Sequence, residues 1–332
     1  MKTKAAVLRN IGGPLIIEEL EISKLERGQI LVKILYSGLC RSNINEINGR
    51  KGAEFIPHLT GHEASAVVLE IGEGITKIRE GDYVVCSWIG GSGLETKSIK
   101  YNSNNGIINS GACSTFSEYA IISESKVICI SEKIESDAAA LLGCAVPTGA
   151  GIIDNEIAIR RDAKIAVFGI GGIGASALMR AATLNLDCTA FDIVPWKLVW
   201  AKVKLGVKAV NIAVFDHRNF FDLAVECSGS QLAMEMAFAS LKKDGTAIIA
   251  GNLEPGKHIS IDPFDLVRGK KLQGSWGGKC NIDRDIPFYA KEYLEGRLPV
   301  RKLITKVYSL NEINKGIKDL EEGNIIRGVV KF

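Results

Sequence analysis

The sequence lacks any hydrophobic run long enough to cross a membrane, and it lacks an excess of charge of either sign. Its longest strongly apolar stretch, residues 138–146, falls far short of the ~20 residues that a membrane helix needs. Lys and Arg number 41 against 38 Asp and Glu, a balance too even for a chain whose main task is to bind nucleic acid phosphates. We therefore expect neither a membrane nor a nucleic acid as a partner.

Secretion signals and low-complexity segments are also missing. Arg9 interrupts the apolar run that follows the basic start of the chain, so no signal-peptide core forms and a cytoplasmic protein is expected. The eight cysteines are then expected as reduced thiols. With 46% hydrophobic and 24% charged residues, the composition excludes collagen-like, disordered and disulfide-miniprotein classes. A length of 332 residues is typical of two domains, or of one large one.

Two different rhythms divide the chain. The first third alternates short apolar segments with Gly-rich or charged turns, which predicts a compact β-rich module, antiparallel or barrel-like. Its strands are expected at 30–36, 64–71, 83–86, 118–123 and 126–130. Residues 90–114 are polar and turn-rich, and we expect them to form a long loop. From Lys164 onward, strands alternate with helices, which predicts βαβ units around a parallel sheet. The expected strands are 164–168, 188–191, 208–210, 223–227 and 246–250, with helices at 175–184, 196–205 and 231–241.

A glycine-rich turn follows the first strand of the parallel sheet. Residues 169–174 read G-I-G-G-I-G, which matches G-x-G-x-x-G between a strand and a helix. Gly169 permits the tight turn, Gly171 lets the backbone approach a pyrophosphate, and Gly174 lets helix and strand pack closely. Asp192 ends the second strand, 18 positions after the last glycine, close to the ~20 expected for a carboxylate that binds the adenosine ribose. This carboxylate would repel a 2′-phosphate, so NAD is favoured over NADP; the alternative is an ordinary helix cap.

Candidate metal ligands are scattered through the β-rich module. They are Cys40, His62 with Glu63 beside it, and Cys144. Two thiolates and an imidazole make a favourable zinc site, and a site with only three protein ligands leaves a position open for catalysis. Spacing alone does not establish this, because Cys144 lies in an apolar run where core packing is the simpler interpretation.

Taken in order, these motifs resemble the zinc-dependent medium-chain alcohol dehydrogenases. The resemblance rests on Cys-Arg-Ser at 40–42, Gly-His-Glu at 61–63, Gly-Cys at 143–144, the dinucleotide turn with Asp192, and Ile-Ile-Arg at 325–327. It implies an α/β fold in two parts. A GroES-like, zinc-binding catalytic domain would comprise residues 1–145 and 276–332, and a doubly wound Rossmann NAD-binding domain residues 146–275.

The resemblance also implies roles for individual residues. Cys40, His62 and Cys144 would bind one catalytic zinc ion, with Glu63 able to approach it, and Ser42 would accept the substrate's proton. The residues that would bind NAD are Arg41, Thr148, Gly169, Gly171, Gly172, Ile173, Gly174, Asp192, Lys197 and Arg327. Trp88 and Phe116 would line the substrate pocket. The expected reaction is reversible hydride transfer between NAD and an alcohol, of polyol or sugar type, or its carbonyl form, in a homodimer or homotetramer.

Three departures from the family pattern matter. Ser92, Glu95 and Ser98 stand where many relatives carry cysteines for a second zinc ion, so no structural zinc is expected. Asn43 replaces an aspartate that orients the zinc-binding histidine, and such changes alter metal affinity or activity by ~10–100-fold. Asn45 replaces a histidine of the proton relay.

Two other functions remain open at this point. One is a metal-free reductase of activated C=C bonds from the same superfamily, and the other is a non-catalytic nucleotide-binding relative. Joint retention of the metal-ligand set, Glu63 and Ser42 argues against both. For the remaining histidines we favour roles without chemistry: His58 as a loop residue rather than part of the pocket, and His217 and His258 as surface or strand residues.

Overall fold

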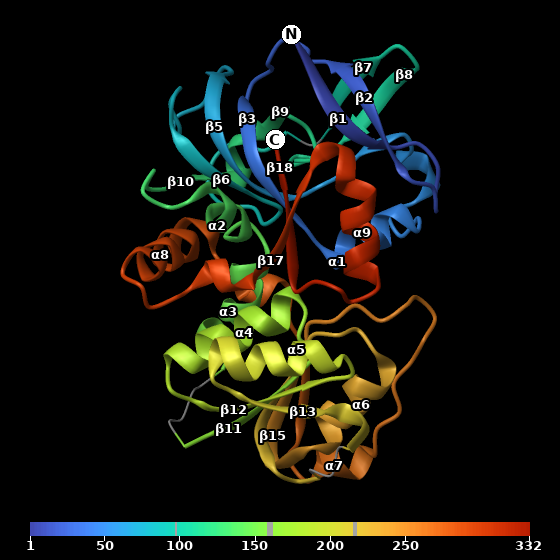
Figure 1. Cartoon of the computed structure of the whole chain (residues 1–332), viewed down its shortest axis with the longest axis vertical. Coiled ribbons are helices and arrows are strands. Elements are labelled where there is room, and N and C mark those ends of the chain that lie inside the picture. Colours follow the sequence, from blue (N-terminus) through green and yellow to red (C-terminus); the bar gives the residue numbers. More distant parts are fainter. Residues whose placement is uncertain (97, 158–161, 215–217) are drawn as a thin grey trace. The chain divides into compact units, whose positions relative to one another are not determined.

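The computed structural model describes residues 1–96, 98–157, 162–214 and 218–332. The chain divides into two compact units, each with its own sheets (Figure 1). The first unit consists of Met1–Cys144, Asn281–Gly296 and Ile304–Phe332, and the second of Ala145–Cys280 and Arg297–Leu303.

The first unit is rich in β-structure. A closed barrel is formed by β1 (Lys2–Leu8), β2 (Leu15–Glu21), β7 (Ile99–Ser103), β8 (Gly106–Ser110) and β4 (His58–Leu59). A larger sheet contains β10 (Val127–Cys129), β6 (Tyr83–Ser87), β5 (Glu63–Ile71), β3 (Gln29–Leu39), β18 (Arg327–Lys331) and β17 (Ile304–Ser309), with β9 (Tyr119–Ser123) also paired to β3. The helices of this unit are α1 (Arg41–Ile47), α2 (Ser136–Leu141), α8 (Ile282–Leu294) and α9 (Ile313–Glu321).

The pattern of apolar residues explains these elements. Along β3, Ile30, Val32 and Ile34 face one core of the unit, as expected for a strand whose side chains alternate between two faces. Helix α9 places Ile313 and Ile317 on one side, where they pack with a second apolar cluster. Both elements therefore form because one of their faces is buried.

The polar segment 90–114 is not the unstructured loop that its composition predicts. It contains the antiparallel pair β7 and β8, and β7 also pairs with β2 while β8 pairs with β4. Ile99, Tyr101 and Ile108 are buried and pack against the barrel. The prediction was wrong because the Asn- and Ser-rich turn between the strands obscured three inward-facing residues that are spaced as a hairpin requires.

Two carboxylates fasten the beginning of this segment. Glu124 is buried and accepts backbone hydrogen bonds from Thr76, Lys77 and Leu94 at 2.7, 2.8 and 2.8 Å. Burial opposes the charged form, but the three backbone donors hold the pKa of Glu124 below its ordinary value. Asp283 accepts from the Ser92 backbone at 2.6 Å and also binds the Lys77 ammonium. These side chains tie residues 92–94 to the body of the unit.

The second unit is a parallel sheet in the order β13-β12-β11-β14-β15-β16. The strands are β11 (Lys164–Phe168), β12 (Asp187–Asp192), β13 (Lys208–Asn211), β14 (Phe221–Glu226), β15 (Leu241–Ile249) and β16 (Lys271–Gly274). The helices are α3 (Ala145–Asn155), α4 (Gly172–Thr183), α5 (Pro195–Trp200), α6 (Gln231–Ala239) and α7 (Pro263–Val267). From β11 the chain adds β12 and β13 on one side of this strand, and it then crosses over and adds β14, β15 and β16 on the other side. This is a doubly wound α/β sheet with a switch point at β11, where such folds bind ligands.

The predicted α/β architecture is confirmed, and the strand predicted at 164–168 matches β11 residue for residue. Among the helices of the described residues, none has both the length and the apolar character that a membrane span requires.

Candidate functional site

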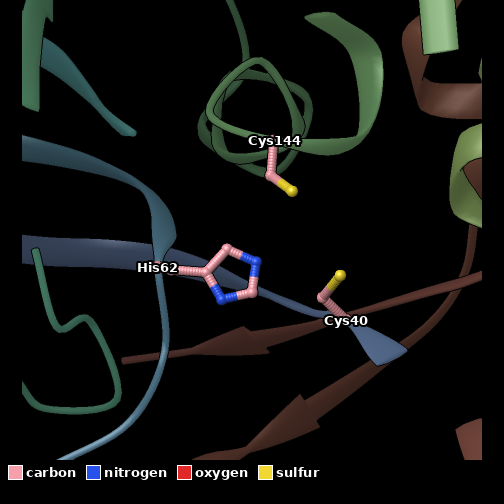
Figure 2. Close-up of side chains that lie close together, drawn as sticks. All are labelled: Cys40, His62 and Cys144. Carbon is pink, nitrogen blue, oxygen red and sulfur yellow. The ribbon is translucent and has the colours of Figure 1, made fainter. Parts of the chain in front are cut away.

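Three ligand-bearing side chains from distant parts of the sequence meet in the first unit. Cys40 lies between β3 and α1, His62 directly precedes β5, and Cys144 follows α2. Their ligand atoms, two sulfurs and a ring nitrogen, all lie within 4.8 Å of one another. Figure 2 shows the three side chains pointing into a common space. In the described residues, this is the group of three that could hold a metal ion.

Local backbone geometry explains the convergence. Strands β3 and β5 pair antiparallel, with Ser37 opposite Ala64, so the end of β3 and the start of β5 lie side by side. Gly143 brings the third ligand close, because a Cβ at this position would lie 2.2 Å from the Cys86 carbonyl oxygen of β6. Only glycine permits that approach of the backbone.

The donor set fits zinc. With Zn–S bonds of ~2.3 Å and tetrahedral angles, two sulfur ligands lie ~3.8 Å apart. The two sulfurs, which are at most 4.8 Å apart, would therefore have to move toward each other by about 1 Å or less to bind one zinc ion. Two thiolates and one imidazole, with no fourth protein ligand among the residues that the structure describes, make the donor set of a catalytic zinc site with an open position.

The surroundings favour the thiolate form of Cys40. A hydrogen bond with Cys144 lowers the pKa of Cys40 well below its ordinary value, against the effect of burial, and His62 and the positive charge of Arg327 lower it further. Arg327 is buried and pairs with the fully buried Glu63. The guanidinium therefore lies between a carboxylate and a thiolate, and both stabilise its charge. Glu63 itself is outside the three-ligand group and is held by Arg327.

Two polar side chains of α1 contact His62. The Ser42 hydroxyl oxygen lies 3.4 Å from Nε2, and the Asn43 side-chain nitrogen lies 3.4 Å from Nδ1. Asn43 is fully buried, and its side-chain oxygen accepts a hydrogen bond from the Cys40 backbone at 2.9 Å. Because this oxygen is already engaged, Asn43 presents N–H groups rather than an acceptor to His62.

The glycine turn of the second unit has the geometry that a dinucleotide requires. Gly169 has φ +92°, a left-handed conformation that favours glycine. A Cβ on Gly171 would meet no atom within 4 Å, which leaves the backbone open to a ligand, whereas a Cβ on Gly174 would lie 1.9 Å from the Gly169 carbonyl oxygen. Helix α4 begins at Gly172 with Ile173 in its first turn, so free backbone N–H groups face this opening.

Asp192 lies at the end of β12, next to this turn. Its carboxylate accepts hydrogen bonds from the backbone of Ile170 at 2.6 Å and of Val194 at 2.9 Å. It thus fixes the shape of the glycine turn, a role that the sequence did not reveal.

Comparison with known proteins assigns this combination of sites to a family. Residues 26–132 match the model of the alcohol dehydrogenase GroES-like domain, and residues 172–291 match that of the zinc-binding dehydrogenases. An NDMA-dependent alcohol dehydrogenase of Amycolatopsis methanolica is 33% identical over 370 aligned residues, which cover 99% of both chains. An S-(hydroxymethyl)glutathione dehydrogenase of Komagataella pastoris is 30% identical and covers 99% of this chain and 97% of its own. The chain belongs to the zinc-dependent medium-chain alcohol dehydrogenases.

Solved structures agree with this assignment. A zinc-binding-domain alcohol dehydrogenase protein of Burkholderia ambifaria superposes with a TM-score of 0.92 at 25% identity, covering 100% of this chain and 99% of its own. Benzyl alcohol dehydrogenase of Acinetobacter calcoaceticus shares the fold, with a TM-score of 0.90 at 24% identity and the same coverage. As a member of this family, the chain is an oxidoreductase that interconverts small alcohols and carbonyl compounds with zinc and NAD.

The remaining residues predicted to bind cofactor in this alcohol dehydrogenase are distributed over both units. Arg41 is exposed at the start of α1, and Arg327 is buried beside Glu63. In the second unit, Thr148 is buried in α3 and Lys197 is buried in α5. Their roles in NAD binding stay predictions. His217 lies outside the described residues.

A pocket of about 200 Å³ in the first unit includes His62 in its wall. Trp88 lines this pocket, whereas Phe116 is fully buried in a core cluster, and the assignment of both to a substrate pocket stays a prediction. His58 also lines the pocket, although the sequence favoured a role away from it. Sequence reasoning missed the charged residues of the wall, Glu46, Lys51, Glu95 and Lys126, because each lies in a polar segment where solvent exposure is the usual outcome.

Proposed function

We propose that this alcohol dehydrogenase binds one catalytic zinc ion through Cys40, His62 and Cys144, and that it oxidises a polar alcohol of polyol or sugar type with NAD. The observation that carries the proposal is the convergence of two sulfurs and a ring nitrogen within 4.8 Å. A metal-free reductase would leave this convergence without a role.

Zinc bound by these residues would lower the pKa of an alcohol hydroxyl and would polarise a carbonyl group in the reverse direction. The chain's own groups prepare the site for this chemistry. Cys144, His62 and Arg327 stabilise Cys40 as a thiolate, the form that binds metal. The buried Glu63 pairs with Arg327 and holds its guanidinium in place, so that the positive charge of Arg327 stays near the metal ligands.

Ser42 is the proposed proton acceptor. Its hydroxyl lies 3.4 Å from His62 Nε2, beside the metal-ligand group, and it is only partly buried. A hydroxyl can accept a proton from the substrate's oxygen while it donates its own proton onward, so it needs no charged state of its own. Asn45, five residues beyond Cys40, cannot extend this relay by titration, and the proton would leave through other hydroxyl groups or water.

NAD accepts the hydride when it is bound, and we propose that the second unit binds it at Gly169–Gly174. The open backbone at Gly171 and the start of α4 support a pyrophosphate site there. The position of Asp192 at the end of β12 supports NAD over NADP, because its negative charge would repel a 2′-phosphate.

We further propose that the enzyme has no structural zinc ion. Ser92 and Glu95 cannot supply the thiolates of such a site, and Glu124 and Asp283 already fasten the segment around them. Backbone hydrogen bonds to the buried Glu124 and to Asp283 would thus replace a metal as the support of this region.

The proposal is tested by metal analysis of the purified protein, NADH titration and turnover of an alcohol panel with NAD. We expect about one zinc ion per chain, and we expect Cys40→Ala and Cys144→Ala to lose both zinc and turnover while they retain NADH binding. The matched control is Cys129→Ala, which removes an exposed thiol on β10 and should change nothing. Full turnover by the Cys40→Ala protein would overturn the proposal.

A further inference from the structure

The pocket beside His62 has a wall that is unusually rich in charge for its size. It holds roughly seven waters at ~30 Å³ each, enough for a substrate of three or four carbons with its oxygens. Two lysines and two glutamates line it, namely Lys51, Lys126, Glu46 and Glu95. A simple aliphatic or aromatic alcohol would have to displace the water from these groups without replacing their hydrogen bonds.

Lys126 is the most deeply placed of these charges. Its side chain is 12% exposed, whereas that of Glu95, its carboxylate neighbour, is 48% exposed. The Lys126 ammonium donates to the Trp88 carbonyl oxygen at 3.3 Å and lies 3.8 Å from the Glu95 carboxylate, beyond hydrogen-bond distance. The positive charge is therefore toward the interior and the negative charge toward solvent.

Lys51, the second lysine, has a similar pair of partners. The Lys51 ammonium donates to His58 Nε2 at 3.0 Å and lies 3.8 Å from Glu46. Burial and the nearby Lys51 charge lower the pKa of His58 to about 4, so this histidine is neutral at pH 7 and can accept that hydrogen bond. Each ammonium therefore uses one of its three donors and lies 3.8 Å from one carboxylate, and Lys126 differs from Lys51 in its deeper position, with a side chain 12% exposed against 36%.

From this arrangement we infer that the substrate carries an anionic group, a carboxylate or a phosphate ester, a few bonds from its reacting hydroxyl, and that Lys126 is the residue that selects it. This inference rests on the proposed function, because it assigns the pocket next to the metal ligands to the substrate. The anionic group would bind beside the Lys126 ammonium, where the half-exposed Glu95 carboxylate lies at 3.8 Å, too far away for a hydrogen bond. A charge-assisted hydrogen bond of this kind contributes more to recognition than one between neutral groups.

The test compares matched substrates in the zinc-loaded enzyme with NAD. One arm pairs 3-hydroxybutyrate with its neutral amide, and the other pairs glycerol 3-phosphate with glycerol. We expect kcat/KM to favour the anion over its neutral partner by at least about 10-fold in one arm, and the arm that shows it distinguishes a carboxylate from a phosphate. Lys126→Gln should lower kcat/KM for the preferred anion by roughly 10- to 100-fold and leave the neutral partner within about 3-fold.

The control is Lys133→Gln, which removes an exposed lysine in the same unit and should leave the preference unchanged. Zinc content and NADH binding of each variant show that it has folded. If neutral alcohols are oxidised without any preference for the anion, or if Lys126→Gln keeps the preference, this inference is wrong and the proposed function stands. If the zinc-loaded, NAD-binding enzyme oxidises none of these or a wider set of alcohols, both are overturned.

Discussion

Replacement of Asn43 by aspartate should strengthen zinc binding. Nδ1 of His62 faces Asn43, so Nε2 is the ring nitrogen that faces the two sulfurs (Figure 2). If Nε2 binds the metal, the proton of the neutral ring must lie on Nδ1. That N–H would then face the amide nitrogen of Asn43, another donor, because the amide oxygen is held by the Cys40 backbone. An aspartate has two acceptor oxygens and can bind both donors at once.

The size of the effect follows from these contacts. A hydrogen bond to a charged group contributes about 1.5–3 kcal/mol, and burial of the new charge at a fully buried position offsets part of it. A net gain of about 1–2 kcal/mol corresponds to roughly 5- to 30-fold tighter zinc binding. The same substitution should lower the melting temperature of the metal-free protein, because no zinc ion then balances the buried negative charge of the aspartate.

Competition with a chelator measures the zinc dissociation constant, and thermal melts with and without zinc measure the coupling to stability. The control is Asn45→Asp, the same change two residues along α1, which should leave zinc affinity unaltered. If Asn43→Asp folds but binds zinc no more tightly than the unaltered protein, the assignment of donors and acceptors around His62 is wrong.

Three further predictions test other parts of the structure. Burial and Lys51 lower the pKa of His58 to about 4, so the unfolded chain binds a proton near pH 6.5 before the folded chain does, and the free energy of unfolding falls as the pH drops from about 6.5 to 4. Between pH 7 and 5, urea denaturation should show a loss of unfolding free energy about 2 kcal/mol greater than in His58→Gln, and equal losses would contradict this. Glu124→Gln should lower the free energy of unfolding by about 2–3 kcal/mol and expose residues 92–96 to proteases without any loss of zinc, because an amide cannot accept all three backbone hydrogen bonds. Unchanged proteolysis would argue against the fastening role of Glu124. Asp192→Asn, which keeps an acceptor for Ile170, should raise the ratio of NADP to NAD activity by about 10-fold or more, and an unchanged ratio would remove Asp192 from cofactor selection.

The nucleotide-binding unit was the more predictable part of the fold. Its strands β11 to β15 are short, apolar and separated by helices, so they are visible in local windows of the sequence, whereas α3, α7 and β16 were not predicted. The glycine turn was also predictable, since Gly169, Gly171 and Gly174 each answer a separate steric demand at a fixed spacing. The hydrogen bond from Ile170 to Asp192 was not, because it joins the glycine turn to the end of β12, which only the completed sheet brings together.

The metal-ligand group shows the limit of local reasoning. Cys40 and His62 meet because β3 and β5 pair, and Cys144 joins them because Gly143 packs against β6, so no spacing in the sequence encodes the site. Its prediction depended on resemblance to a family, not on the pattern of residues alone. The charged pocket wall was missed for a related reason: Lys126 sits in an ordinary polar turn, and its burial arises from the chain folded around it.

The central claim is that Cys40, His62 and Cys144 hold one zinc ion together. X-ray absorption at the zinc edge of the purified enzyme, compared with the Cys144→Ser variant, tests it most directly. The expected result is two sulfur ligands at ~2.3 Å and a nitrogen ligand at ~2.0–2.1 Å, with one sulfur lost in the variant. A shell of oxygen and nitrogen ligands alone, or a spectrum that the variant leaves unchanged, would contradict the account.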